Sequence, residues 1–102
     1  MDLDLEKIEG FDWYNGNLEH IKKHNVSRDE CEEVFLNEPP IITEDESHSD
    51  VEKRYRVYSQ THEGRLLFIT TTFREAKIRV ISARDQNRKE RKEFELTGGE
   101  EL

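Results

Sequence analysis

The sequence of 102 residues contains a single cysteine, Cys31, which excludes an intramolecular disulfide and argues against a thiolate metal site. Cys31 lies between Glu30 and Glu32, and the charges of these carboxylates raise the pKa of a thiol, so a cysteine nucleophile is not expected. Long apolar runs are missing too, and none approaches the length that crosses a bilayer. The acidic start from Met1 to Asp4 lacks the apolar segment of a secretory signal peptide. These absences lead us to expect a cytoplasmic protein that does not associate with membranes.

Two signatures of catalysis are also absent. The sequence holds no glycine-rich phosphate loop and no Ser-His-Asp motif, which argues against a nucleotide-driven enzyme or a hydrolase of those classes. Hydrophobic residues make up only 32% of the chain and charged residues 39%, a balance that approaches that of disordered proteins. The apolar residues nevertheless cluster in runs such as 66–69 and 78–81. A single domain with a small, well-patterned core is therefore predicted.

The formal net charge is −8, but the charge is distributed unevenly along the chain. Residues 1–52 carry sixteen acidic and four basic side chains, whereas residues 53–92 carry twelve basic and four acidic ones. A local patch, rather than the total charge, decides where an anion binds. The second half of the chain can therefore bind a polyanion, although most charge runs only solvate a protein surface.

Two helices are predicted in the first half of the chain. Apolar residues at helical spacing favour a helix over residues 15–24, which Asn25 can end in a left-handed conformation. Ser27 and Glu30 form a capping-box pattern that begins a second helix. Pro39, followed by a second proline, ends that helix.

The second half of the chain alternates between polar and apolar residues. Residues 53–60, 65–73 and 77–83 are predicted strands, and Ile41-Ile42 is a short strand or an extended link. A charged helix follows at about 85–95. The predicted architecture is an α+β domain with two N-terminal helices, a three- to four-stranded antiparallel sheet and a C-terminal helix.

The domain is expected to span residues 11–95. Residues 1–10 are predicted to form an acidic N-terminal tail, and residues 96–102 a flexible C-terminal tail that begins near two glycines. No internal repeat divides the chain.

The basic run that begins at Lys77 is the strongest functional feature. Strand alternation places Lys77 and Arg79 on one face, which can also present Arg54 and Arg56 from the neighbouring strand, with Arg84 at the strand's end. The planar guanidinium group donates several hydrogen bonds and suits phosphate oxygens. A solvated charged face is the alternative interpretation of the same run.

Two histidines lie four residues apart on the first predicted helix. His20 and His24 share one face, as a metal site requires, but no convincing third ligand is present, so no metal site is predicted. His24 follows Lys23, and this pair can serve acid–base chemistry near neutral pH. Capping of the helix end is the alternative role of His24.

Several segments, taken in order and spacing, resemble the BrnT family, the toxin half of bacterial and archaeal type II toxin–antitoxin pairs. The resemblance covers about Phe11 to Phe94. The matching segments are Phe11-Asp12-Trp13 with Asn17, Lys23 to Ser27, Glu33-Val34-Phe35, His48-Ser49 with Glu52 and Arg54-Tyr55, Gly64 to Leu67, and Ile78 to Arg84 with Arg88, Glu90-Arg91 and Phe94. Asn25 stands where the family has a glycine, and asparagine tolerates the left-handed conformation.

The resemblance implies a RelE-like fold and metal-independent RNA cleavage that needs no cofactor and inhibits translation. It also implies a cognate ribbon-helix-helix antitoxin (BrnA-like), with operator DNA bound only through that antitoxin. By position, it implies six catalytic candidates: Lys23, His24, Glu52, Arg65, Arg79 and Arg84. Together with the strand pattern, it suggests five further residues that contact RNA: Arg54, Arg56, Lys77, Arg88 and Arg91.

RNA cleavage through the ribose 2′-OH needs a base for the hydroxyl proton, cations for the charged phosphorane and an acid for the leaving 5′-oxygen. The arginines would stabilise the charge, and either His24 or Glu52 would transfer protons; the sequence leaves that choice open. Two other functions stay open as well. One is a catalytically inactive BrnT-like module that binds an antitoxin and co-regulates its operon, and the other is an acidic interaction domain without a nucleic-acid role.

Overall fold

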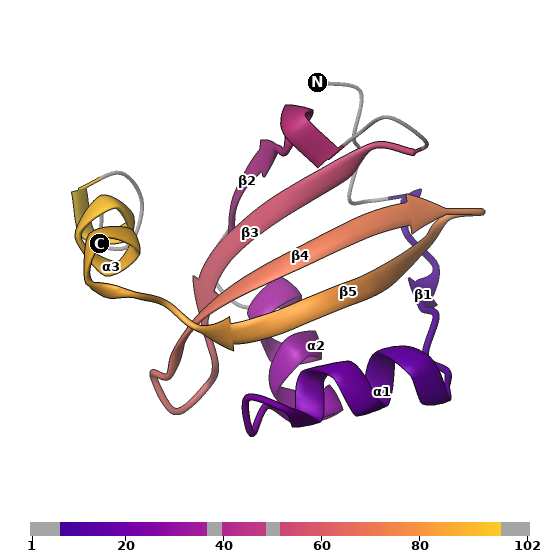
Figure 1. The fold of residues 1–102 in the computed structure, drawn as a ribbon, viewed down its shortest axis with the longest axis horizontal. Coiled ribbons are helices and arrows are strands. Elements are labelled where there is room, and N and C mark those ends of the chain that lie inside the picture. The colour runs from indigo at the N-terminus through magenta and orange to yellow at the C-terminus, as the bar shows by residue number, and fades with distance from the viewer. Residues whose placement is uncertain (1–6, 37–39, 49–51, 97–102) are drawn as a thin grey trace.

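The structure is a computed structural model that describes residues 7–36, 40–48 and 52–96. Within these ranges it contains three α-helices, a short 3-10 helix and one five-stranded sheet (Figure 1). The elements are, in chain order, β1 (Gly10–Phe11), α1 (Asn15–Lys22), α2 (Arg28–Leu36), β2 (Ile41–Glu44), the 3-10 helix (Glu46–His48), β3 (Arg54–Gln60), β4 (Leu66–Arg74), β5 (Lys77–Asp85) and α3 (Arg88–Phe94). Residues 1–6 and 97–102, which belong to the two predicted tails, lie outside the described residues.

The strands are arranged in the order β1-β5-β4-β3-β2. Strands β2 to β5 form an antiparallel meander, and β1 runs parallel to β5, with Gly10 opposite Lys77 and Phe11 opposite Ile78. The predicted α+β fold, with two helices before the meander and one after it, is confirmed. The predicted sheet was incomplete, because the described sheet is mixed and has five strands. Two residues are too few for the alternation that reveals a strand, so β1 was missed.

Residues before Phe11 also take part in the fold. The backbone N–H of Glu9 donates to the carbonyl of Ala76 at 2.7 Å, and Ile8 packs against the core. The sequence placed both residues in the acidic tail, because charge dominates that segment. Ala76 lies more than sixty positions from Glu9 along the chain, so no local pattern indicates this hydrogen bond.

Helices α1 and α2 cover one face of the sheet, α1 against β5 and α2 against β3 (Figure 1). Along β3, Tyr55, Val57 and Ser59 are buried, and the residues between them are partly exposed. The core joins buried side chains of both helices and three strands: Ile21, Val26, Cys31, Val34, Val57, Leu67, Ile69, Ile78, Val80 and Ala83. We call the opposite side of the sheet, which carries Arg54, Arg56 and Tyr58 and their partners in register on β4 and β5, the open face.

A β-bulge in β5 determines which cations share the open face. Arg79 pairs with Thr72 and Arg84 pairs with Phe68, but the register shifts between them and leaves Ile81 as the extra residue. Arg79 and Arg84 are five positions apart, and an odd separation puts two residues on opposite faces of a regular strand. Because the bulge adds one residue, both arginines lie on the open face.

The turn between α1 and α2 follows the predicted local signals. Asn25 adopts the left-handed conformation with φ of 59°, as expected at a helix end. The N–H of Glu30 donates to Ser27 Oγ at 3.1 Å, and the N–H of Ser27 donates to Glu30 Oε1 at 3.0 Å. These contacts fix the start of α2. None of the helices in the described segments combines the length and the apolar character that crossing a bilayer requires.

Candidate functional site

Arg79 lies at the centre of a cluster on the open face. Its Nε and Nη2 groups donate to Oδ2 of Asp12 at 3.2 and 2.9 Å, and its guanidinium carbon lies 5.2 Å from the ring centre of Tyr14. Asp12 is held at the sheet edge, because its N–H donates to the carbonyl of Ile78 at 2.8 Å. Among the described residues, Nη1 of Arg79 has no acceptor. This end of the guanidinium can therefore bind an incoming anion.

Three more cations lie near Arg79. Arg54 and Arg79 flank Thr72 in register, which places their Cα atoms roughly 10 Å apart at normal strand spacing. Arg56 follows Arg54 on the same face, and Lys77 precedes Arg79. Lys77 is exposed and forms no ion pair with any residue that the structure describes. A phosphate on this face would lie within reach of several of these side chains.

Glu52 brings a carboxylate to the same region. It accepts a hydrogen bond from Nη2 of Arg74 at 2.7 Å, and Arg74 pairs with Lys77 in register. The hydrogen bond to Glu52 raises the pKa of Arg74 above its ordinary value. Glu52 is therefore the proton-transfer candidate that lies closest in the fold to Lys77 and Arg79.

Arg84 lies further along the open face and connects the sheet to α3. Its Nη1 and Nη2 groups donate to the two carboxylate oxygens of Glu90 at 2.8 and 2.9 Å, and its guanidinium carbon lies 4.3 Å from the ring centre of Phe68. Burial alone would raise the pKa of Glu90, but the hydrogen bonds from Arg84 and from the backbone of Asn87 lower it below its ordinary value. This paired contact anchors the start of α3.

Arg65 lies at the end of the sheet where β4 begins and β5 ends. All five N–H donors of its guanidinium have acceptors there. Nε and Nη2 donate to the carboxylate of Asp85, Nη1 donates to Glu30 and to the carbonyl of Asn25, and Nη2 also donates to the carbonyl of His24. The distances range from 2.8 to 3.3 Å. These contacts hold the α1–α2 turn against the ends of β4 and β5.

The same turn carries Lys23 and His24, which are both exposed. His24 lies near Asp85, whose pKa is lowered mainly by the hydrogen bond from Arg65, with smaller contributions from the positive charges of Arg91 and His24. Asp85 is opposite Leu67 on the helix-covered side of the sheet and lies six positions beyond Arg79, roughly 20 Å along the strand.

The predicted site residues therefore form two groups. The first lies on the open face and contains Glu52, Arg54, Arg56, Lys77, Arg79 and Arg84. The second lies at the α1–α2 turn and contains Lys23, His24 and Arg65. The two proton-transfer candidates, His24 and Glu52, are in different groups, so one phosphate cannot contact both.

The two remaining candidates, Arg88 and Arg91, lie exposed on α3. Arg91 is close enough to Asp85 to lower the pKa of that carboxylate slightly. Over the ranges that the structure covers, no three His, Cys, Asp or Glu side chains are grouped as a metal site requires.

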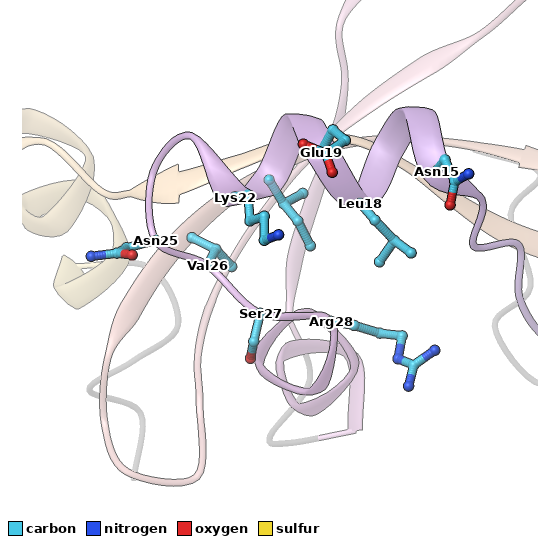
Figure 2. Close-up of a pocket in the computed structure, with 9 residues that line it drawn as sticks. Asn15, Leu18, Glu19, Lys22, Asn25, Val26, Ser27 and Arg28 are labelled. Carbon is cyan, nitrogen blue, oxygen red and sulfur yellow. The ribbon is translucent and has the colours of Figure 1, made fainter.

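A pocket of about 590 Å³ lies between α1 and α2, beside the second group, because Lys22, Asn25 and Ser27 of the α1–α2 turn help to line it. Leu18, Ile21 and Val26 contribute its apolar surface, and Figure 2 shows Leu18 and Lys22 extending from α1 toward α2. Arg28 lies at the rim (Figure 2). Glu19, Lys22 and Arg28 also line the pocket, but none of the predicted site residues does, whereas the open face brings six of them to one side of the sheet. The open face is therefore the better candidate for phosphate chemistry.

The sequence did not reveal the carboxylates and the ring that hold the cations. Asp12 and Tyr14 contact Arg79, Glu90 contacts Arg84, and Asp85 contacts Arg65. Asp12 lies in the Phe11-Asp12-Trp13 segment that carries the family resemblance, and this is the one signal that pointed to it. The contact of Arg65 with Asp85 depends on strand register, and that of Arg84 with Glu90 depends on how the chain turns from β5 into α3.

Comparison with known proteins supports the resemblance. The family model described as the ribonuclease toxin BrnT of type II toxin–antitoxin systems matches residues 13–90, from the link between β1 and α1 to the first turn of α3. A search of curated proteins gives no match. The matched segment covers more than three quarters of the chain and includes both groups of candidate residues. The chain therefore belongs to the BrnT family of ribonuclease toxins of type II toxin–antitoxin systems.

Proposed function

We propose that this protein is an RNA endonuclease that binds its substrate across the open face and cleaves it by metal-independent attack of the ribose 2′-OH. One observation carries the proposal: Arg54, Arg79 and Lys77 lie together on the sheet face opposite α1 and α2, and Glu52 lies beside them. Cations fixed by a sheet are already positioned for the charge that develops on a phosphorane.

In the proposed reaction, the 2′-oxygen attacks phosphorus while Glu52 accepts the 2′-hydroxyl proton. Arg79 and Arg54 stabilise the negative oxygens of the phosphorane. Lys77 donates a proton to the 5′-oxygen as the bond from phosphorus to that oxygen breaks. The products are a 2′,3′-cyclic phosphate and a 5′-hydroxyl, so the reaction needs no metal and no cofactor.

Arg65 has a different role in this proposal. Because its five donors are all engaged, a phosphate would have to displace a carboxylate or a backbone carbonyl to bind it. Arg65 acts as a positioning residue for the α1–α2 turn. Lys23 and His24, together with Arg88 and Arg91, would contact more distant parts of the RNA.

The biological setting follows from the family. The cleavage would inhibit translation in the cytoplasm, and a ribbon-helix-helix antitoxin of the BrnA type would neutralise the protein. Operator DNA would be contacted only through that antitoxin.

Incubation of the purified protein with total RNA in EDTA tests the proposal. The wild type should cleave RNA and leave cyclic phosphate ends, and Arg79→Ala should be slower by about 10²- to 10³-fold. Glu52→Gln should also lose activity, whereas His24→Gln should retain most of it. Arg28→Ala is the matched control, because Arg28 is exposed on α2, away from the open face. Equal activity of Arg79→Ala and Arg28→Ala would contradict the proposed site.

A non-catalytic module that binds an antitoxin is the second candidate function. It is favoured by the carboxylates of Asp12 and Glu90, which already neutralise Arg79 and Arg84. This function requires a tight complex with the antitoxin together with no RNA cleavage at any protein concentration. The pair of Arg79 with Asp12, whose side chains are 24% and 34% exposed, is accessible enough to solvent for a phosphate to replace the carboxylate, which is why the nuclease is preferred.

A further inference from the structure

A second pocket lies on the open face, between the sheet and α3. It has a volume of about 380 Å³ and is lined by Ile41, Thr43, Arg56, Tyr58, Glu93 and Phe94. Ile41 and Tyr58 are opposite each other in register, and the ring of Tyr58 packs edge-to-face on Phe68 with 5.0 Å between ring centres. Phe94 from α3 is almost fully buried. The pocket therefore has apolar and aromatic walls.

Arg56 provides a hydrogen-bond donor that is not used within the described residues. Its Nη2 group donates to the carbonyl of Glu44 at 3.3 Å, but its Nε is inaccessible to solvent and has no partner in the parts of the chain described here. A buried donor without an acceptor is costly and calls for an explanation. A small rotation of the Arg56 side chain toward the pocket would bring this Nε to a carbonyl oxygen or ring nitrogen of a bound ligand, which would supply the missing acceptor.

The surroundings of the pocket suit a nucleotide. Arg54 lies two positions from Arg56 on the same face, and Phe68, the neighbour of Tyr58 in register, lies between Tyr58 and Arg84. A base inside the pocket would therefore have cations on two sides for its flanking phosphates. Proteins that read single-stranded RNA stack unstacked bases on aromatic rings and bond their edges.

We propose that this pocket binds one unstacked nucleobase of the RNA, with Tyr58 and Phe94 as the apolar walls and Arg56 Nε as donor to the base edge. The inference rests on the proposed function, because the open face is taken as the RNA-binding surface. It adds a substrate class, which is single-stranded RNA in which one base leaves the stack.

Binding of short oligoribonucleotides, measured by fluorescence anisotropy, tests the pocket separately from phosphate binding. A normal hexanucleotide is compared with one of the same length in which every base is removed. The wild type should bind the normal oligomer at least about fivefold more tightly, as expected from stacking of a single base. Equal affinity for the two would overturn the pocket and leave the phosphate-binding face intact.

Two variants identify the pocket as the origin of that preference. Thr43→Trp fills it from an exposed position, and Arg56→Lys keeps the charge but removes the Nε donor. Both should abolish the preference for the normal oligomer, which is the ratio of the two affinities, and both should retain salt-sensitive binding of the base-free oligomer. Arg28→Lys, at an exposed position on α2 outside the pocket, is the matched control and should retain the preference. A preference that survives in both pocket variants would contradict the proposal, provided that circular dichroism shows them folded.

The absence of salt-sensitive binding to either oligomer would overturn the proposed function itself. In that case a titration with nucleosides, monitored by nuclear magnetic resonance, tests whether the pocket binds a nucleobase. Shifts of the Tyr58 and Phe94 resonances, with those of Ser27 unchanged, would support a nucleoside site. Unchanged Tyr58 and Phe94 resonances would overturn it.

Discussion

Replacement of Arg65 by alanine removes the side chain that joins the α1–α2 turn to the ends of β4 and β5. The variant loses two ion pairs, with Glu30 and Asp85, and two hydrogen bonds to the carbonyls of His24 and Asn25. If Arg65 is a positioning residue, the main effect of the change is on the stability of the fold.

The solvent exposure of the paired side chains determines how much stability the variant should lose. The side chains of Arg65 and Glu30 are 26% and 28% exposed, so their charge-assisted hydrogen bonds should contribute about 1.5 kcal/mol. Asp85 is 63% exposed, and solvent screening limits its contribution to about 0.5 kcal/mol. In the variant, the carbonyls of His24 and Asn25 accept hydrogen bonds from water instead, so losing Arg65 as their donor adds little to the loss of stability. The free energy of unfolding should therefore fall by about 2 kcal/mol, and Tm by about 8–16 °C.

The same contacts predict a pH dependence. Burial would raise the pKa of Glu30, but hydrogen bonds from Ser27 and Arg65 lower it below its ordinary value of 4.5. The hydrogen bond from Arg65 lowers the pKa of Asp85 below 3.8. Since both pKa values are lower in the folded state, this stabilisation is present at neutral pH and is lost as the pH falls below about 4.5.

Thermal unfolding followed by circular dichroism between pH 3 and pH 7 checks both predictions. The Tm of the wild type should fall more steeply on acidification than that of Arg65→Ala, and the difference between the two should shrink as the pH falls. Arg65→Lys should lose about half as much stability, because an ammonium group cannot span two carboxylates. Arg88→Ala, at an exposed position, serves as the control and should change stability by less than about 0.5 kcal/mol. An Arg65→Ala variant that unfolds like Arg88→Ala at every pH would refute the reasoning.

Three further predictions concern other parts of the molecule. Ser27→Ala removes the capping hydrogen bond to the N–H of Glu30 and should reduce the free energy of unfolding, measured in urea, by about 1 kcal/mol. Burial, with help from neighbouring carboxylates, raises the pKa of Cys31 to about 12, so a thiol reagent at pH 8 should label this residue only after unfolding; rapid labelling of the folded protein would contradict the structure. Asp12→Asn removes the anion that pairs with Arg79 and should raise RNA affinity about two- to fivefold in filter binding, whereas a fall in affinity would mean that Asp12 is needed to position Arg79.

Local chemistry explains which parts of the fold could be predicted from the sequence. The reciprocal bonds between Ser27 and Glu30 and the left-handed Asn25 each depend on a few adjacent residues, so the start of α2 and the turn before it were predicted correctly. Strand β1 was missed because its hydrogen bonds go to β5, far along the chain. The bulge at Ile81 could not be predicted from the local sequence either, because the register of two strands is set only when they pair.

The candidate site illustrates the same limit. The sequence identified arginines as phosphate-binding candidates, but it gave Arg65 and Arg79 the same role. The structure engages every donor of Arg65 and leaves one end of Arg79 without an acceptor among the described residues. The separation of His24 from Glu52 likewise depends on which end of the sheet the α1–α2 turn meets. The different roles of Arg65 and Arg79, and the separation of His24 from Glu52, are set by tertiary contacts that the sequence alone does not reveal.

The acidic net charge and the basic open face become compatible once the ion pairs are considered. Six cations lie on that face, namely Arg54, Arg56, Arg74, Lys77, Arg79 and Arg84, but Asp12, Glu52 and Glu90 already pair with three of them. A phosphate that replaces a carboxylate exchanges one ion pair for another and releases little free energy. These three paired cations would then contribute little to the binding of RNA. The dependence of log K on log salt should accordingly have a shallower slope than the value of about −4 that six full phosphate contacts would give. A protein of net charge −8 can therefore bind RNA locally while its remaining surface repels RNA, which confines the substrate to the open face.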